Sequence, residues 1–437
     1  MPPLLNALAN AFLAGEPDVE QIVARASRTL GRSWPWLRPV ARSFVEIYAG
    51  QTRPRRRDVI QFFRNDPIFC SAWSQRNLRV AEWLLEAPVM QPVPAASAWD
   101  LPAIGTAPAL AEWLAIRPEE LDWFAALKGP RCCAAHYHYT VLPKGRGASR
   151  LIEAPKPRLK DLQRRILTGV LEKIPVPSAV HGFVKGRSVR TFAAPHAGQQ
   201  VVLRMDLEDF FPSIPGVRIQ ALFRTLGYPE AVADLLGGIC TNAVPAAVWA
   251  GYRPSRETRD LYLRPHLPQG TPTSPALANL CTYRVDCRLM GLANSAGAVY
   301  TRYADDLAFS GGHAFNQCVE RFFIQAAAIL MEDGFSVHHR KTRIMHQGVR
   351  QYLAGLAVNR EVNVLRPDFD RLKATLTNCV RLGPASQNRE NHPSFRAHLQ
   401  GRVAFVESIN PQKGRRLRGI FERIHWPSGI EPEPHNP

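Results

Sequence analysis

The sequence predicts an α+β protein that carries a helical extension at its N-terminus. Three observations carry this prediction. Seven of the nine tryptophans lie before residue 130, so the N-terminal third differs in composition from the rest. From about residue 137, apolar strand-like segments alternate with helical ones, and residues 366–437 are rich in Arg and in helix formers. The 437 residues suffice for two to three domains with sizeable cores.

The composition is that of an ordinary globular chain with a strong positive charge. Hydrophobic residues make up 46% and charged residues 21%, which disfavours disorder. Lys and Arg number 55 against 37 Asp and Glu, a formal net charge of +18. Such an excess favours a polyanionic partner, with nucleic acid first and an anionic membrane second.

The cysteines and the N-terminus indicate a cytoplasmic protein. The eight cysteines form no C-x-x-C pair and no Cys/His set at zinc spacing, so we expect reduced, buried thiols. The run at 4–15 has no basic segment ahead of it, and Leu5, Leu8 and Phe12 fall at helical spacing. This favours an amphipathic helix over a signal peptide. No apolar stretch is long enough to span a bilayer, so we expect no membrane partner.

The N-terminal region predicts several helices followed by a linker. Residues 4–88 are typical of helices, one of them entered through the basic turn TRPRRRD at 52–58. A basic turn is more often a solvated surface than an RNA contact. The Pro- and Ala-rich stretch at 88–97 is the predicted linker, and 109–123 predicts two short helices split at Pro118.

The remaining elements follow from hydrophobic period and turn residues. Strands at 139–144 and 149–154 flank KGRGA, which predicts a hairpin with a basic tip. The other predicted elements are a helix at 160–174, a strand at 201–211 that ends in acids, a helix at 274–293, a hairpin at 298–311 and a helical C-terminal domain.

Adjacent carboxylates stand at the centre of the second hairpin. Asp305 and Asp306 lie between two apolar runs, where divalent cations would make two like charges tolerable. Asp-Asp is also a common turn dipeptide. Asp206, however, ends the apolar strand VVLRMD, and a strand end is where an enzyme of this class presents a ligand. Two hard cations held by these acids would support phosphoryl transfer by the two-metal mechanism.

Further motifs agree in order and spacing with one family. They are SRLIEAP at 149–155, HGFVKGRS at 181–188, MDLEDFF at 205–211, LPQGTPTSPALANL at 267–280, YADD at 303–306, HHRKT at 338–342 and QYLAGLAVN at 351–359. From about residue 100 to 425 the chain resembles the reverse transcriptases, and within them the bacterial retron type. The resemblance implies a right-hand polymerase with fingers, palm and thumb behind the helical extension. The implied domains are an extension at 1–95, a helical lead-in at 96–130, fingers and palm at 131–365, and a thumb at 366–437.

The resemblance also implies roles for individual residues. Catalysis would rest on Asp206, Asp305, Asp306 and Lys341, the last as proton donor to the leaving pyrophosphate. Two Mg²⁺ ions, with Mn²⁺ as an alternative, would be held at Asp206, Leu207, Asp305 and Asp306. The incoming nucleotide would be bound by Lys144, Arg146, Arg150, Asp209, Phe210, Phe211, Gln269 and Gly270, with Phe211 as the steric gate against a 2′-hydroxyl. HGFVKGRS would follow the template strand, and the predicted primer and RNA contacts are Tyr303, Leu353, Gly355, Lys413, Arg415, Arg416 and Arg418.

The C-terminal basic cluster has a predicted orientation. Leu417, Ile420 and Phe421 form an apolar stripe, so we expect Arg415, Arg416 and Arg418 to point outward towards a duplex.

Some positions depart from the retron pattern. The usual Asn-Ala-x-x-His reads Phe192 to His196 here, without the Asn, and the usual Val-Thr-Gly reads Leu353-Ala354-Gly355. The Asn that usually precedes the Arg-Lys pair is replaced by histidine, at His338 or His339. The first two departures bear on RNA recognition and leave the polymerase chemistry unchanged.

The sequence therefore predicts an RNA-directed DNA polymerase of retron type. Its partners would be a structured non-coding RNA serving as template and primer, an RNA–DNA hybrid product and dNTPs, and the resemblance allows for an effector protein. It also implies priming from an RNA 2′-hydroxyl, a short branched cDNA and a role in phage defence. The alternatives are another defence-associated or group II intron-derived reverse transcriptase, and a catalytically silent RNA-binding protein with a polymerase fold. Three mutually repelling carboxylates argue against the silent protein.

Overall fold

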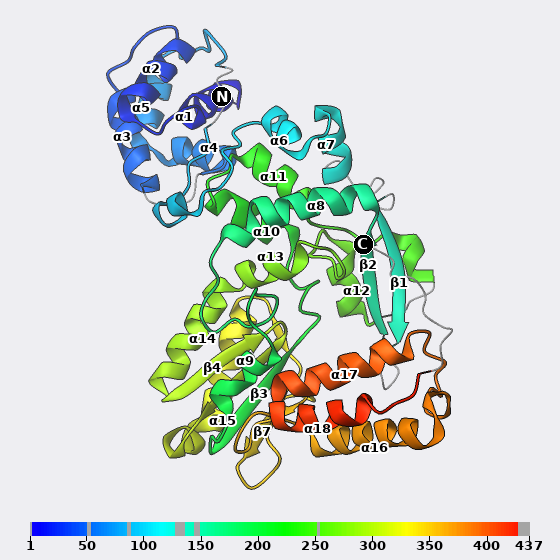
Figure 1. The fold of residues 1–437 in the computed structure, drawn as a ribbon. Coiled ribbons are helices and arrows are strands. Elements are labelled where there is room, and N and C mark those ends of the chain that lie inside the picture. Colours follow the sequence, from blue (N-terminus) through cyan, green and yellow to red (C-terminus); the bar gives the residue numbers. More distant parts are fainter. Residues whose placement is uncertain are drawn as a thin grey trace. The chain divides into compact units, whose positions relative to one another are not determined.

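The chain folds into two compact units, each built from two stretches of sequence. The computed structural model describes residues 2–49, 54–84, 89–126, 136–143, 149–250 and 254–426 (Figure 1). The first unit comprises Met1–Val176 and Asp209–Tyr283, and the second comprises Pro177–Glu208 and Arg284–Pro437. The mixture of helices and strands confirms the predicted α+β class.

The N-terminal helices of the first unit pack around a core of their own. They are α1 (Pro2–Leu13), α2 (Val19–Thr29), α3 (Leu37–Tyr48), α4 (Arg56–Asn65) and α5 (Pro67–Gln75). Leu5, Leu8 and Phe12 are buried in this core, as their helical spacing predicts. Phe12 meets the rings of Phe44 and Phe63 edge-on, at centroid distances of 5.2 and 4.8 Å. The helical extension is therefore a packed structure.

The rest of the first unit combines short helices with one hairpin. Its elements are η1 (Pro94–Trp99), α6 (Ala107–Leu114), α7 (Pro118–Ala125), β1 (Tyr137–Pro143), β2 (Ser149–Pro155), α8 (Pro157–Gly169), η4 (Leu171–Lys173), α10 (Gly216–Thr225), α11 (Glu230–Ile239), η6 (Ala246–Ala250), α12 (Arg256–Leu263) and α13 (Ser274–Cys281). β1 and β2 pair antiparallel, which confirms the predicted hairpin, and the helix break before Pro118 is also confirmed.

Two predicted helices have different bounds in the structure. The helix predicted at 160–174 begins earlier and ends at Gly169, where a Cβ would stand 2.5 Å from the Trp113 ring. The helix predicted at 274–293 is two helices, because the chain breaks at Thr282. The Thr282 hydroxyl donates to the carbonyl of Ala278, a local bond that competes with continued helix.

The second unit is built on a five-stranded antiparallel sheet. Its strands are β3 (Val201–Glu208), β4 (Ala298–Tyr303), β5 (Asp306–Gly311), β6 (Ser336–Val337) and β7 (Arg343–His346). β5 lies between β4 and β3, and both β6 and β7 pair with β3 on its other side. The helices of this part are α9 (Val189–Ala193), η5 (Ala194–His196), α14 (Tyr283–Ser295) and α15 (His313–Glu332). The long α15 packs on β3, β5 and β6.

A second small sheet and three helices complete this unit. They are β8 (Tyr352–Leu353), β9 (Leu356–Ala357), β10 (Asn363–Val364), α16 (Arg366–Leu382), η7 (Pro384–Ser386), α17 (Phe395–Ile409) and α18 (Pro411–Phe421). In Figure 1 the three helices lie side by side. One continuous core joins Val202 of β3 and Leu353 of β8 with Leu376, Val403 and Leu417 of the three helices. The C-terminal helices therefore share their core with the sheet.

The described part of the chain also bears on the cysteines and on membrane insertion. Its six cysteines, at positions 70, 240, 281, 287, 318 and 379, are all free. None of the helices described here has the length and apolar character needed to cross a bilayer.

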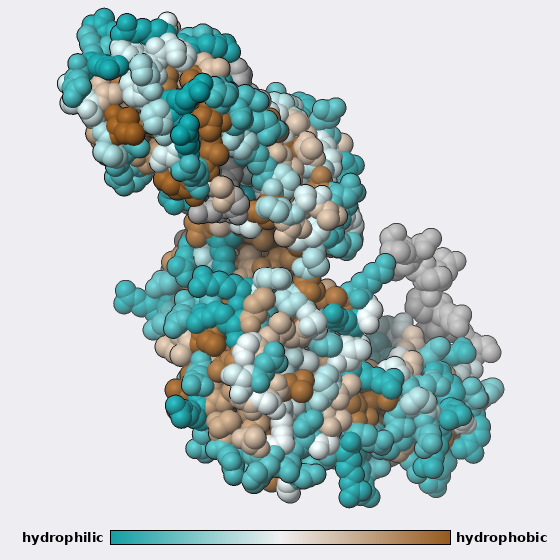
Figure 2. All heavy atoms as spheres, turned by 90° about the vertical axis from the view of Figure 1, so that its left-hand side faces the viewer, coloured by the Kyte–Doolittle hydropathy of each residue, from teal (hydrophilic) through white to brown (hydrophobic). Residues whose placement is uncertain are grey.

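The face drawn in Figure 2 is largely hydrophilic, with hydrophobic residues in separate areas.

Candidate active site

Three carboxylates come together at one end of the sheet in the second unit. Asp206 near the end of β3 lies directly opposite Asp306 at the start of β5. Ala304 and Asp305 form the two-residue turn of the β4–β5 hairpin, and the amide of Leu207 donates to the carbonyl of Asp305 at 3.0 Å. Side chains directly opposite in an antiparallel pair lie close together, so the register itself juxtaposes these acids.

Each of the two paired acids is held by a cation. Lys341 Nζ lies 2.7 Å from Asp206 Oδ1. Arg204 donates through Nε and Nη2 to Asp306 Oδ1, at 2.9 and 2.7 Å. The ion pairs place the predicted catalytic Lys341 beside the predicted ligand Asp206, although 135 residues separate them in sequence.

Arg204 is a site residue that sequence reasoning missed. It precedes Asp206 by two residues, and strand periodicity puts both on one face. An arginine inside an otherwise apolar strand needs a carboxylate partner, and this is the signal that could have found it.

The electrostatics of the turn favour a bound cation. Burial raises the pKa of Asp305, and the negative charges of Asp206 and Asp306 raise it further. Burial also raises the pKa of Asp306, although the ion pair with Arg204 opposes this. Carboxylate oxygens are the ligands that Mg²⁺ and Mn²⁺ prefer, so the donor set fits such ions.

The carboxylates do not form a closed metal cage in this conformation. Among the described residues, no three Asp, Glu, His or Cys side chains are grouped closely enough to hold an ion as they stand. Asp206 is turned to Lys341 and Asp306 to Arg204, which accounts for this arrangement. Metal binding would exchange these cationic partners for the ion.

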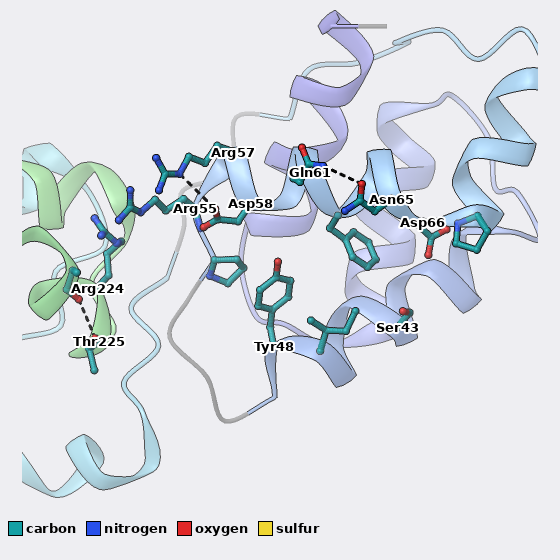
Figure 3. A pocket seen from close by; sticks show the side chains of 15 residues that line it. Ser43, Tyr48, Arg55, Arg57, Asp58, Gln61, Asn65, Asp66, Arg224 and Thr225 are labelled. Atoms are coloured by element: carbon teal, nitrogen blue, oxygen red, sulfur yellow. Dashed lines mark hydrogen bonds and ion pairs between the residues drawn. The ribbon is translucent and has the colours of Figure 1, made fainter. Parts of the chain in front are cut away.

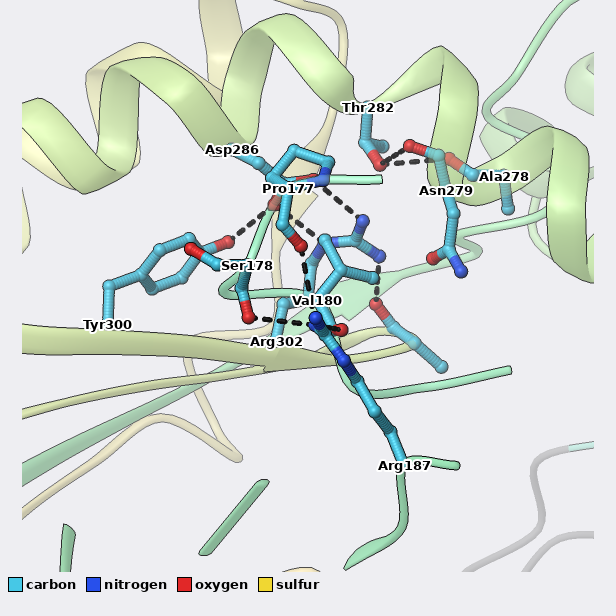
Figure 4. Close-up of polar contacts among 11 residues, drawn as sticks. Pro177, Ser178, Val180, Arg187, Ala278, Asn279, Thr282, Asp286, Tyr300 and Arg302 are labelled. Carbon is cyan, nitrogen blue, oxygen red and sulfur yellow. Dashed lines mark hydrogen bonds and ion pairs between the residues drawn. The ribbon is translucent and has the colours of Figure 1, made fainter. Parts of the chain in front are cut away.

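A buried ion pair stabilises the β4–β5 turn. Arg302 donates through Nε and Nη2 to the two oxygens of Asp286, at 2.8 and 2.7 Å, and both side chains are at most 1% exposed (Figure 4). The hydroxyl of Tyr300 donates to the same carboxylate at 2.8 Å. The remaining Arg302 nitrogen, Nη1, donates to the carbonyl of Ala304 at 3.1 Å. Ala304 has φ of +55°, an uncommon conformation for alanine, and Arg302 holds it there.

The segment predicted to follow a template strand braces the same turn. His181 donates its amide to the carbonyl of Arg302 at 2.7 Å. At Gly182 a Cβ would stand 2.4 Å from the amide nitrogen of Ala304, so only glycine permits this approach. Arg187 turns inward and donates to the carbonyls of Pro177, Ser178 and Val180, as Figure 4 shows. The Arg187 guanidinium therefore donates to backbone carbonyls of the protein itself.

His196, the histidine retained from the retron pattern, is a buried cross-strand link. Its Nδ1 lies 2.6 Å from the hydroxyl of Ser310 on β5, and its Nε2 lies 2.7 Å from the hydroxyl of Thr301 on β4. Burial lowers the pKa of His196 to about 3, so the ring is neutral at physiological pH. It ties the two strands of the hairpin together.

The predicted nucleotide-binding residues belong to the first unit. Arg150 on β2 is partly buried, and its Nε has no hydrogen-bond partner within the described part of the chain, which suits an anionic ligand. The predicted contacts Lys144 and Arg146 lie outside the described residues.

Gln269 and Gly270 lie against the same strand as Arg150. The amide of Glu153 donates to the carbonyl of Gln269 at 2.8 Å. Gly270, with φ of +128°, packs on the backbone of Glu153. The carboxylate of Glu153 is fully buried and bonds to His266 Nε2 at 3.0 Å and to Asn242 Nδ2 at 2.7 Å. This network fixes the strand on which Gln269 and Gly270 rest.

The residues that follow β3 differ in exposure. Asp209 has φ of +43° and accepts a hydrogen bond from the Thr258 hydroxyl at 2.9 Å. Phe210 is 4% exposed, whereas Phe211 is only partly buried and meets the Phe210 ring at 5.5 Å. Of the two rings, Phe211 is thus the one available to a ligand.

The predicted primer contacts fall into accessible and buried groups. Ala354 and Gly355 form the β8–β9 turn, with φ of +44° and +80°. Leu353, by contrast, is fully buried. The Tyr303 ring is partly buried beside the rings of Phe183 and Phe192, at 6.4 and 5.8 Å.

The orientation predicted for α18 is correct in part. Leu417 and Phe421 face the core, and Arg415 and Arg416 are exposed. The prediction that Arg418 points outward is wrong, because its Nη2 donates to Glu407 Oε2 of α17 at 2.8 Å. An arginine beside the apolar stripe reaches the neighbouring helix and finds a carboxylate there.

Comparison with known proteins agrees with this arrangement. Residues 142–366 match the family model described as reverse transcriptase (RNA-dependent DNA polymerase). The chain is 42% identical to the retron Mx65 reverse transcriptase of Myxococcus xanthus over 66% of this chain and 65% of that protein. It is 36% identical to the retron Mx162 reverse transcriptase of the same organism, over 76% of this chain and 70% of that one. With the retron Ec86 reverse transcriptase of Escherichia coli it shares 30% identity, over 67% and 82%.

Among solved structures, similarity is found to the foamy viral protease-reverse transcriptase in complex with an RNA/DNA hybrid. The TM-score is 0.36 at 14% identity, covering 67% of this chain and 31% of that one. The family model and the curated relatives settle the assignment: the chain belongs to the reverse transcriptases, and within them to the bacterial retron type.

Proposed function

We propose that this protein is an RNA-directed DNA polymerase that copies a cognate structured RNA into a short cDNA. The observation that carries the proposal is the meeting of Asp206, Asp305, Asp306 and Lys341 at one end of the sheet. Burial, and then repulsion by Asp206 and Asp306, raise the pKa of Asp305, so ionised carboxylates in this arrangement are costly unless cations bind them. The similarity to the retron Mx65 and Mx162 reverse transcriptases supports a retron RNA as template.

The chemistry assigns a task to each group. Asp206, Asp305 and Asp306, with Leu207 beside them, would hold divalent ions, which supply charge stabilisation for phosphoryl transfer and lower the pKa of a priming hydroxyl. Lys341, already 2.7 Å from Asp206, can give a proton to the departing pyrophosphate. Arg302 acts as a positioning residue through the Ala304 carbonyl.

The finer features of the proposal come from the resemblance to retron enzymes. They are priming from an RNA 2′-hydroxyl, a branched RNA–DNA product, and a role in phage defence with an effector protein. Sequencing the nucleic acid that co-purifies with the protein tests the retron assignment on which they rest. We expect one RNA species joined to a short cDNA, whereas random cellular RNA would contradict the retron assignment.

Sugar selection provides a test of Phe211. We expect Phe211→Val to raise ribonucleotide incorporation relative to deoxynucleotide by roughly tenfold or more, because the partly exposed ring would no longer occupy the space of a 2′-hydroxyl. Single-nucleotide incorporation kinetics measure the ratio. Phe395→Val is the matched control, since Phe395 is a partly buried ring at the start of α17, outside the predicted nucleotide-binding residues, and should leave discrimination unchanged. An unchanged ratio in Phe211→Val would place the gate elsewhere.

The exposed arginines of α18 provide a test of duplex binding. We expect Arg415→Gln with Arg416→Gln to weaken binding of cognate and unrelated structured RNAs alike, because phosphate contacts carry little sequence information. The slope of log affinity against log salt should flatten by about one unit per lost contact. Arg321→Gln, an exposed position on α15, is the control for the loss of charge alone. If the salt dependence of affinity has the same slope in the unmodified protein, the double variant and Arg321→Gln, the template runs over another surface.

A further inference from the structure

The N-terminal extension and α10 enclose a cavity that the polymerase chemistry does not use. The cavity has a volume of about 780 Å³ and is lined by α3, by α4 with the turn before it, and by the end of α10 (Figure 3). All of these elements belong to the first unit. Pro54, Arg55, Arg57 and Asp58, from the basic segment that the sequence alone would assign to a solvated surface, line one end of it.

Three guanidinium groups gather at that end of the cavity. Arg55 and Arg57 come from the start of α4 and Arg224 from the last turn of α10. The side chain of Arg224 is only 6% exposed, and its nearest carboxylate, Asp234, lies 3.5 Å away. Burial lowers the pKa of Arg224 and the positive charges of Arg55 and Arg57 lower it further, whereas the negative charges of Asp234 and Glu230 oppose this shift. In Figure 3 the three side chains converge from the two elements.

Carboxylates pair with two of the three arginines, Arg57 and Arg224, and leave Arg55 without an ion pair in the described part of the chain. Asp58 accepts the backbone amide of Arg55 at 2.9 Å and lies 3.5 Å from Arg57, and Glu230 accepts the amide of Arg56 at 3.0 Å. These carboxylates therefore serve largely as acceptors for the helix N-terminus. An anion placed among the three arginines would relieve their repulsion.

Aromatic rings and side-chain amides line the rest of the cavity. Tyr48 and Phe62 are both partly buried, and both rings are supported by Phe44, at 4.9 and 5.5 Å. Gln61 and Asn65 lie beside them on α4 and are joined by a hydrogen bond of 2.9 Å. Figure 3 shows Tyr48, Gln61 and Asn65 on the wall that leads away from the arginines. Rigid aromatic rings next to amide groups form a surface suited to an unpaired base.

We propose that this cavity binds one unpaired nucleotide of an RNA strand, with its phosphate among Arg55, Arg57 and Arg224 and its base against Tyr48 and Phe62. Planar guanidinium groups suit phosphate because they donate two parallel hydrogen bonds. Aromatic faces accept any base, so the site favours an unpaired strand over a particular sequence. The helical extension thereby gains an RNA-binding function separate from the catalytic carboxylates.

Photocrosslinking of the full-length protein tests this proposal. The probe is a single-stranded RNA of about ten nucleotides that contains 4-thiouridine, used with EDTA and without dNTPs, so that polymerase activity plays no part. Crosslinked peptides are identified by mass spectrometry. We expect adducts on the α3 and α4 peptides that contain Tyr48 or Phe62, and an adduct yield about tenfold lower in Arg55→Glu with Arg57→Glu.

The controls distinguish the cavity from general charge. Arg64→Glu reverses the charge of one arginine on the exposed side of α4, outside the cavity lining, and should leave the yield within about twofold. If the double Glu variant does not fold, Arg55→Gln with Arg57→Gln replaces it, because Arg57 is 72% exposed and tolerates a neutral side chain. Adducts elsewhere only, or an equal loss in Arg64→Glu, would overturn the proposal.

Competition identifies the source of the nucleotide. Unlabelled RNA strand that displaces the probe, where millimolar AMP does not, supports a strand as the natural ligand. If AMP also displaces the probe, the cavity binds a phosphate and a base, and a free nucleotide is sufficient to occupy it. Failure of both competitors would show that the crosslinks do not report a site.

Discussion

Asp305→Asn is expected to reduce nucleotide incorporation by about 10³-fold or more while leaving RNA binding nearly intact. The substitution removes one of the carboxylates that meet at the β4–β5 turn, and several kcal/mol of charge stabilisation in phosphoryl transfer depend on such ligands. RNA binding relies instead on the positive surface of the chain. Primer extension and filter binding on the same preparation measure both quantities.

Two features make this result interpretable. Burial and neighbouring charge raise the pKa of Asp305, so its ionised form opposes folding, and a neutral Asn should not destabilise the metal-free protein. The control Asp161→Asn removes an exposed carboxylate on α8 that pairs with Arg164, and this variant should extend primers normally. Extension at the unmodified rate by Asp305→Asn would refute the metal-ligand assignment.

The second large effect is expected from the buried pair behind the turn. Asp286→Ala should destabilise the second unit by about 3–5 kcal/mol, because it leaves the fully buried guanidinium of Arg302 without a counter-charge. The apparent Tm should fall by on the order of 10 °C. Thermal unfolding followed by circular dichroism measures it. Asp370→Ala, which breaks the exposed pair with Arg366, should leave the Tm nearly unchanged.

A double variant separates stability from positioning. Asp286→Leu with Arg302→Met removes both charges and should recover most of the lost Tm. It also removes the hydrogen bond from Arg302 to the Ala304 carbonyl, so incorporation should remain low. Restored incorporation in the double variant would show that Arg302 contributes only to folding.

The sequence predicted the part of the site that depends on local pattern. Apolar alternation around Asp206 and around the Asp305–Asp306 pair predicted a strand and a hairpin, and both are present as β3 and β4–β5. Strand register then followed from the need to bury one face. The helical spacing of Leu5, Leu8 and Phe12 likewise predicted α1.

Ion-pair partners that are distant from one another in the sequence could not be predicted from local pattern. Arg204 with Asp306, Arg302 with Asp286 and Arg418 with Glu407 are separated by 102, 16 and 11 residues, and pairing rules for a single helix or strand do not reach across them. The break at Thr282 was missed for a related reason, since its hydroxyl bond to Ala278 overrides an apolar pattern that fits one long helix.

The order of synthesis adds a constraint that follows from the strand order of the main sheet. β3 lies between β5 on one side and β6 and β7 on the other, and all three partners follow it by roughly a hundred residues or more. A nascent chain on the ribosome therefore carries an apolar, unpaired β3 while the intervening stretch of the first unit emerges and folds. The carboxylates of Asp206 and Asp306 can meet only after β5 has left the exit tunnel. A chain terminated before β5 would leave the backbone edge of β3 unpaired and prone to aggregation. We therefore expect such a truncated chain to depend on chaperones.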